Sequence, residues 1–255
     1  MRVENTLKSL YVETVARWSR YTFNDFNGLN DFNDFNVQRF QRFQFACRLL
    51  FLWLALAGIF PQAGNAQQWE TVRWIDDGDT VVLDTGDRIR YIGINCPEID
   101  HGDRPAEPFG DLAKRYNKEL VYGKRVRIEY DLEKRDRHGR LLAYLFLGNG
   151  RFINGALVAE GLAYCLPHGE NTKFRDALLA YQREAMSAKR GIWKDLKESG
   201  TGYVGNRISG RFHTRECILA KSISKRNRIH FKTKQDAFWN GFAPGKRCLG
   251  EYWKQ

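Results

Sequence analysis

The stretch from residue 69 to residue 94, WETVRWIDDGDTVVLDTGDRIRYIGI, decides the fold of the chain. Residues 69–75, 80–83 and 88–94 are short runs of β-branched, aromatic and alternating apolar residues, which are typical of strands. Two clusters of turn-forming residues separate them, DDGD at 76–79 and DTGD at 84–87. The stretch therefore predicts three strands joined by tight turns.

The same kind of sequence continues beyond residue 94. Two further strands and one strand-like segment are expected at 125–130, 141–147 and 162–166. The helical spacing of apolar residues predicts three helices, at 108–120, 153–160 and 173–189. Short strands with few helices are typical of a small closed barrel of the oligonucleotide-binding (OB) type. We therefore predict an α+β fold in which residues 67–197 form a five-stranded OB-fold β-barrel with about three helices.

The residues before the barrel predict export. Residues 1–44 form a leader whose repeated Phe-Asn-Asp and Arg-Phe-Gln units have low complexity, so we expect disorder. Residues 45–66 follow a positive flank and combine a short apolar run with small residues, as a secretory signal peptide does. We expect cleavage near Ala66 and a secreted or periplasmic protein. If this segment is not cleaved, it anchors the chain in a membrane instead.

Three motifs inside the predicted barrel carry polar chemistry: DGDT at 77–80, RYIGINCPE at 90–98 and DRHGR at 136–140. Carboxylate and carbonyl oxygens are ligands of hard cations. Guanidinium groups bind phosphate oxygens at two points, and a carboxylate can activate water. The chain also carries a net charge of +11, which favours polyanionic partners or, more simply, reflects a basic solvated surface. The combination suits cleavage of a phosphodiester.

Residues 67–197 resemble the staphylococcal nuclease (thermonuclease) family. The matching segments occur in family order and are DGDTVVL, RYIGINCPE, PFGDLAKRYNKEL, DRHGRLLAYLF, NGALVAEGLAY and KRGIW. The resemblance implies a calcium-dependent, sugar-nonspecific nuclease that leaves 3′-phosphate ends on DNA and RNA. We expect single-stranded substrates to be preferred, no obligate protein partner and a monomer.

The resemblance also implies the roles of individual residues. Arg90 and Arg140 would bind the scissile phosphate, and Glu98 would be the general base. The Ca²⁺ ligands would be Asp79, Asn95 and the backbone carbonyl of Cys96. Most family members have aspartate at the position of Asn95, so we predict weaker calcium binding or an altered metal preference. Two further residues are either phosphate ligands or ordinary surface residues, Arg137 and His138.

The resemblance places Cys165 in a strand near Cys96. A disulfide between them would rigidify the metal loop. The alternatives are two buried free thiols or a nucleophilic cysteine, and the last is disfavoured because no histidine stands in a motif beside either residue.

Residues 203–255 resemble the small zinc-binding module of the Ada-type DNA repair methyltransferase, and we expect a small α+β module. His213 and Cys217 match its first ligand pair and Cys248 its last ligand, whereas Gly245 stands where a third cysteine is expected. Three alternatives follow: a Zn²⁺ ion with a fourth ligand from elsewhere, a Cys217–Cys248 disulfide, or a degenerate module. An oxidising compartment favours the disulfide slightly.

The sequence thus predicts an exported calcium-dependent nuclease with a basic C-terminal module. The alternative is a catalytically weak nucleic-acid-binding OB-fold protein of the cell envelope, since such barrels commonly bind oligonucleotides and Asn95 weakens the metal site. A structural envelope protein held by its apolar N-terminus would explain the leader but none of the motifs.

Overall fold

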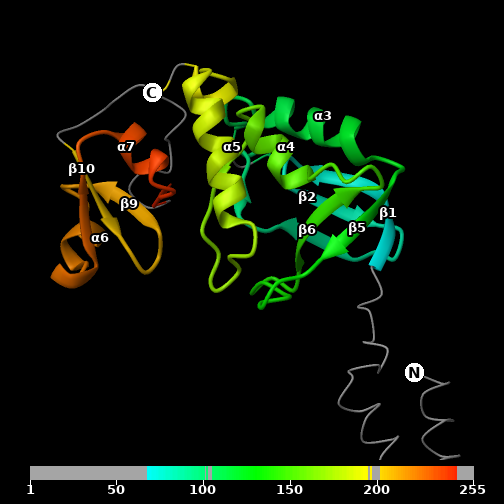
Figure 1. The fold of residues 1–255 in the computed structure, drawn as a ribbon, viewed down its shortest axis with the longest axis horizontal. Coiled ribbons are helices and arrows are strands. Elements are labelled where there is room, and N and C mark those ends of the chain that lie inside the picture. Colours follow the sequence, from blue (N-terminus) through cyan, green and yellow to red (C-terminus); the bar gives the residue numbers. More distant parts are fainter. Residues whose placement is uncertain (1–67, 101, 103–104, 195, 197–201, 246–255) are drawn as a thin grey trace, which may run out of the picture. The chain divides into compact units, whose positions relative to one another are not determined.

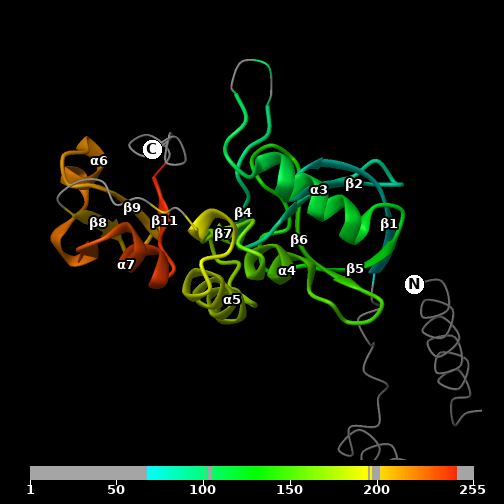
Figure 2. The same ribbon diagram turned by 90° about the horizontal axis from the view of Figure 1, so that it is seen from above.

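The computed structural model describes residues 68–100, 102, 105–194, 196 and 202–245 (Figures 1 and 2). The predicted leader and signal segment, residues 1–66, lie outside the described residues. In the described part of the chain, every helix is too short or too polar to cross a membrane.

The centre of the fold is a closed barrel of five strands, which confirms the predicted OB-type barrel. The strands are β1 (Gln68–Asp77), β2 (Thr80–Leu83), β3 (Arg88–Tyr91), β5 (Arg125–Glu129) and β6 (Leu141–Leu147). Around the barrel they follow the order β1-β2-β3-β6-β5, and only β3 and β6 run parallel to each other. Closure leaves no open sheet edge, so the short strands are stable without a partner chain.

Three α-helices accompany the barrel, as predicted: α3 (Gly110–Val121), α4 (Ile153–Ala159) and α5 (Arg175–Ser187) (Figure 1). α3 contacts β1, and α4 packs between β6 and α5. The core between these elements is apolar and close to fully buried, with Val72, Val81, Ile89, Val126, Leu145 and Leu157 among its least exposed residues. Burial of such side chains, worth about 1.5–3 kcal/mol each, is the main stabilising contribution.

The strand predicted at 88–94 is interrupted, and the interruption shapes the site. β3 ends at Tyr91, and the chain turns at Gly93, whose φ of 81° favours glycine. The next two residues form β4 (Ile94–Asn95), which leaves the barrel and pairs antiparallel with β7 (Tyr164–Cys165). The residues after β4 therefore lie beside the β1–β2 turn instead of continuing the barrel wall.

The C-terminal residues form the predicted small α+β module. Its sheet has the order β10-β8-β9-β11, with β8 (Tyr203–Asn206), β9 (Arg211–Thr214), β10 (Arg228–Phe231) and β11 (Ala243–Pro244). Its helices are α6 (Ile218–Ser222) and α7 (Lys234–Trp239), with a 3₁₀ helix η3 (Lys225–Asn227) between them; another, η2 (Gly191–Trp193), follows α5.

The module shares buried apolar side chains with the barrel domain. One hydrophobic cluster contains Tyr164 and Trp193 together with Phe212 and Phe238 of the module. The fully buried Gln182 of α5 adds two hydrogen bonds: its Oε1 accepts from the Cys165 N–H, and its Nε2 donates to the Phe238 carbonyl, both at 2.6 Å. Because buried amides are costly without partners, this bridge fixes the module against β7.

Candidate active site

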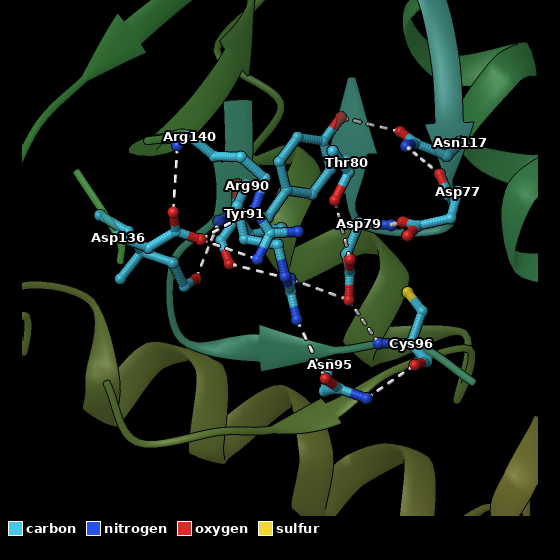
Figure 3. Close-up of polar contacts among 12 residues, drawn as sticks. Asp77, Asp79, Thr80, Arg90, Tyr91, Asn95, Cys96, Asn117, Asp136 and Arg140 are labelled. Carbon is cyan, nitrogen blue, oxygen red and sulfur yellow. Dashed lines mark hydrogen bonds and ion pairs between the residues drawn. The ribbon is translucent and has the colours of Figure 1, made fainter. Parts of the chain in front are cut away.

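The tight turn between β1 and β2 places Asp79 inside the fold. The Asp79 N–H donates to Oδ1 of Asp77 at 2.9 Å, and the residue Asp79 is only 4% exposed. Thr80, the next residue, pairs with Arg90 of β3. Arg90 Nη1 therefore reaches Asp79 Oδ2 at 2.8 Å and forms a buried ion pair (Figure 3).

Asn95 and Cys96 complete a closed set of contacts around this pair (Figure 3). Asn95 Oδ1 accepts from Arg90 Nη2 at 3.0 Å, and Asn95 Nδ2 donates to the Cys96 carbonyl at 2.7 Å. The Cys96 N–H in turn donates to Asp79 Oδ2 at 2.7 Å. We call Asp79, Arg90, Asn95 and Cys96 the active-site ring. It contains the three predicted metal ligands and one predicted phosphate ligand.

The electrostatics of the active-site ring follow from its burial. Desolvation raises the pKa of the Asp79 carboxyl well above its usual value, and the Arg90 guanidinium opposes this rise. Desolvation alone would lower the pKa of Arg90, but the carboxylates of Asp79, Asp77 and Glu98 leave that pKa raised. Asp79 therefore needs a nearby positive charge to stay ionised, and Arg90 supplies one.

Glu98 lies in the loop that follows β4, and its negative charge acts on Arg90. Two hydrogen bonds with Glu107 fix this loop: the Glu98 N–H donates to the side-chain Oε2 of Glu107 at 2.9 Å, and the Glu107 N–H donates to the Glu98 carbonyl at 2.8 Å. Gly110, the first residue of α3, packs so closely on the Glu98 carbonyl that a Cβ there would collide with it. The predicted general base is thus held near the active-site ring.

Arg140 reaches the same region from the strand next to Arg90. β3 and β6 run parallel with Arg90 opposite Leu142, and Arg140 directly precedes β6. Figure 3 shows both arginines with the active-site ring. The ion pair joins Asp79 to Arg90, and Arg140 lies in the same region (Figure 3); the predicted catalytic roles of these residues stay predictions.

Asp136 orients Arg140, a role that our reading of the sequence missed although Asp136 opens the DRHGR motif. Its Oδ2 accepts from Nε and Nη2 of Arg140 at 2.8 and 2.7 Å, and its Oδ1 accepts from the Arg140 N–H at 3.0 Å. Partial burial alone would raise the pKa of Asp136, but hydrogen bonds from Arg140 and the His138 N–H lower it. The four-residue spacing between Asp136 and Arg140 is the feature of the sequence that could have indicated this ion pair.

Arg137 and His138 lie at the exposed tip of the same turn. Their side chains contact each other, with Arg137 Nε 3.1 Å from His138 Nε2. Their predicted contact with phosphate stays a prediction.

The donor set of the active-site ring fits a hard cation such as Ca²⁺. It offers the Asp79 carboxylate, the Asn95 amide oxygen and the Cys96 carbonyl, all of them oxygen ligands. In the present arrangement Asn95 Oδ1 accepts from Arg90 and Asn95 Nδ2 donates to the Cys96 carbonyl, so these two contacts would have to rearrange when a cation binds. The described residues contain no group of three or more His, Cys, Asp or Glu side chains that could hold a metal, at this site or at another.

Cys96 and Cys165 are free and buried, so the disulfide alternative is wrong and the alternative of two buried thiols is confirmed. Cys165 pairs with Ile94, which leaves Cys96 two residues away along the strand. The Cys96 side chain packs beside Gly78 and Ala113, whereas Cys165 lines a cavity near α5. Burial raises the pKa of Cys96 and raises that of Cys165 to about 12, which disfavours a thiolate nucleophile.

In the C-terminal module, His213 and Cys217 lie together, with Nδ1 3.8 Å from Sγ. Gly245 packs on the His213 ring, and a Cβ at this position would collide with the ring. The ring therefore fills the space that a third cysteine would need. Cys217 is disulfide-bonded, so its sulfur is not a thiolate ligand and nothing here supports zinc. Cys248 lies outside the described residues.

Comparison with known proteins identifies relatives of the barrel domain. The family model described as "Staphylococcal nuclease homologue" matches residues 88–195. The thermonuclease of Staphylococcus intermedius is 34% identical over 151 residues, which cover 57% of this chain and 89% of that protein. The thermonuclease of Staphylococcus hyicus is 35% identical over 146 residues, which cover 54% and 85%. Endonuclease YncB of Bacillus subtilis is 38% identical over 136 residues, which cover 51% and 62%.

Proposed function

Because the chain belongs to the staphylococcal nuclease family and is therefore a nuclease of that type, we propose that it is an exported, calcium-dependent and sugar-nonspecific enzyme. It would hydrolyse DNA and RNA, preferably single-stranded, to products with 3′-phosphate ends, and act as a monomer. The observation that carries the proposal is the active-site ring, which gathers oxygen ligands and a guanidinium in one buried place with Glu98 and Arg140 nearby.

The side chains at this site have complementary tasks. Arg90 and Arg140 would bind the non-bridging oxygens of the scissile phosphate and stabilise the charge that peaks in the five-coordinate transition state. Asp136 orients the guanidinium group of Arg140 for this contact. Asp79, Asn95 and the Cys96 carbonyl would hold calcium, which when bound supplies positive charge against the phosphate.

Glu98 would act as the general base. It would take a proton from the water that attacks phosphorus. The bond from phosphorus to the 5′ oxygen then breaks, the 5′ oxygen takes a proton from solvent, and the phosphate stays on the 3′ side. The nucleophile is water, in keeping with the buried and protonated state of both thiols.

Product analysis tests the proposal. We expect the protein to cut single-stranded DNA and RNA in the presence of calcium but not of a chelator, and the ends can be identified by treatment with a 3′-phosphatase before labelling. Products with 5′-phosphate ends, or equal cleavage with chelator, would contradict it. Binding without cleavage would instead support the alternative of a catalytically weak nucleic-acid-binding protein.

The Asn95→Asp variant tests the assignment of the metal ligands. Calcium affinity rises with the number of charged ligands, so we expect the substitution to tighten calcium binding by roughly tenfold. Without calcium the variant should be less stable, because it replaces the hydrogen bond from Asn95 Nδ2 to the Cys96 carbonyl with a contact between oxygens. Calorimetric titration with calcium alone and the calcium-dependent shift in Tm measure both effects.

Asn149→Asp is the matched control for this variant. It adds the same charge at the exposed turn after β6, where Asn149 Oδ1 accepts from the Arg151 N–H. It should leave calcium affinity unchanged. Equal affinities for the wild type and for Asn95→Asp would show that Asn95 is not a ligand.

A further inference from the structure

Arg211, the first residue of β9, lies close to the active site although it belongs to the C-terminal module. The link is Tyr164, which pairs with Asn95 between β7 and β4. The Tyr164 hydroxyl is under the influence of Arg211 from the module and of Arg90 and Asp79 from the active-site ring. Arg211 and Arg90 also act directly on each other.

Packing contacts explain this position. Leu166, the residue after β7, donates its N–H to the Gly93 carbonyl at 2.8 Å, so the loop after β7 is tied to the start of β4. The next residue, Pro167, packs against Gly210, where an added Cβ would lie only 2.5 Å from Pro167 Cγ. Arg211 follows Gly210 directly. The glycine therefore permits an approach that brings Arg211 to the edge of the site.

The module is held firmly in this place. The Tyr164 ring meets the Phe238 ring edge to face, with centroids 5.7 Å apart. The Gln182 bridge described above ties the same strand, β7, to the Phe238 carbonyl. Arg211 is thus presented by a rigid support, which limits the conformational entropy lost when its side chain binds a ligand.

Arg211 differs from the two active-site arginines in the charges around it. Arg90 pairs with Asp79, and Arg140 pairs with Asp136. Among the described residues, Arg211 instead donates Nη1 to the Pro244 carbonyl at 3.1 Å, and no carboxylate lies within ion-pair distance. Burial first, and then the nearby Arg90, lowers its pKa. A half-buried cation beside a second cation is stabilised by an anion that bridges or adjoins them.

We propose that Arg211 binds a phosphate of the substrate strand adjacent to the scissile phosphate, so that the C-terminal module forms part of the nucleic-acid-binding surface. This inference rests on the proposed function, because it takes the scissile phosphate to lie at Arg90 and Arg140. A single-stranded polyanion carries a phosphate at every nucleotide, and a guanidinium next to Arg90 suits the neighbouring one.

Two further arginines lie near Arg211 at the junction between the module and the barrel domain, Arg175 and Arg207. Burial lowers the pKa of His168, in the loop after β7; Glu133 opposes this shift and Arg90 and Arg211 add to it, so the imidazole is neutral at neutral pH. A cavity of about 100 Å³ beside this loop is lined in part by His168, Arg175 and Arg207. The two arginines offer positions for further phosphates away from the site of cleavage.

The test uses the full chain with Arg211→Gln and a fluorescent oligothymidylate in chelator, so that binding is measured without cleavage. We expect the affinity to fall by roughly fivefold to tenfold, which corresponds to the loss of one phosphate contact. The slope of log K against log salt should decrease by about 0.7, the value for one phosphate contact on a single strand. Arg211→Lys should keep most of the slope, because it keeps the charge.

Arg226→Gln is the matched control. Arg226 lies in η3 and is exposed, and η3 leads into β10, two positions from β9 in the sheet. It should keep the wild-type affinity and slope. Unchanged affinity and slope in Arg211→Gln would overturn the proposal.

A second readout separates substrate binding from an indirect effect. With calcium, Arg211→Gln should lower kcat/KM on the oligothymidylate by roughly fivefold to tenfold but leave a dinucleotide with one phosphodiester unaffected. An equal loss on both substrates would mean that Arg211 supports the active site structurally, which also overturns the proposal. If the wild type cleaves neither substrate, the proposed function fails, while the binding measurement in chelator still decides about Arg211.

Discussion

Replacing Glu98 with glutamine is expected to lower kcat by roughly 10²-fold or more, with little change in KM. Glutamine keeps the shape of the side chain but cannot take a proton from the attacking water, and general-base catalysis contributes about 10²–10⁴-fold to such reactions. The hydrogen bonds with Glu107 that fix the loop remain available. Single-turnover rates at saturating calcium measure the chemical step directly.

Glu119→Gln serves as the control for Glu98→Gln. Glu119 lies on α3 and is exposed, and the same change there should leave kcat unaltered. Calcium titration of the Glu98 variant shows whether the metal site is retained. A variant with a normal calcium affinity and a nearly normal rate would remove Glu98 from the mechanism.

The Arg140→Lys variant is expected to lose roughly 10²–10³-fold in kcat. Lysine preserves the charge but not the planar fork, so it loses the two-point contact with phosphate oxygens that strengthens in the transition state. It also loses the paired hydrogen bonds to Asp136 that hold the side chain in place. Rates measured against substrate concentration should show the loss in kcat more than in KM.

Arg135→Lys is the matched control, since Arg135 belongs to the same turn and donates Nη1 to the Gly139 carbonyl at 2.7 Å. It should retain nearly full activity. Asp136→Asn should reproduce part of the Arg140→Lys loss without altering calcium affinity, because Asp136 acts through Arg140. Equal activities of the two arginine variants would argue against a specific role for Arg140.

Much of the barrel could be predicted because its signals are local. The strand-like runs at 69–75, 80–83, 125–130 and 141–147 correspond to β1, β2, β5 and β6, and the turns DDGD and DTGD bound β2. The β-branched and apolar residues of these runs and the turn residues between them agree with what the closed barrel requires. The segments predicted as helices likewise become α3, α4 and α5, since their apolar spacing matches the face that each buries.

The interruption at Gly93 could not be read from the local pattern. The run 88–94 is strand-like throughout and alternates from Arg88 to Tyr91, yet the backbone leaves the barrel after Tyr91 and β4 pairs with β7, some seventy residues later in the chain. Pairing between distant segments depends on the whole fold. The same reason explains the thiols: proximity of Cys96 and Cys165 was expected, but the two-residue offset and the directions of their side chains are set by strand register.

The amino-acid sequence by itself determined the barrel, the order of its motifs and the chemical character of the residues at the site, because residue type and short-range spacing encode these properties. Only the tertiary structure decided that Asn95 links Arg90 to the Cys96 carbonyl, that Asp136 orients Arg140 and that Gly210 brings Arg211 towards the site. These relations join segments far apart in the chain or depend on the directions of individual side chains, and close packing of the folded chain fixes both.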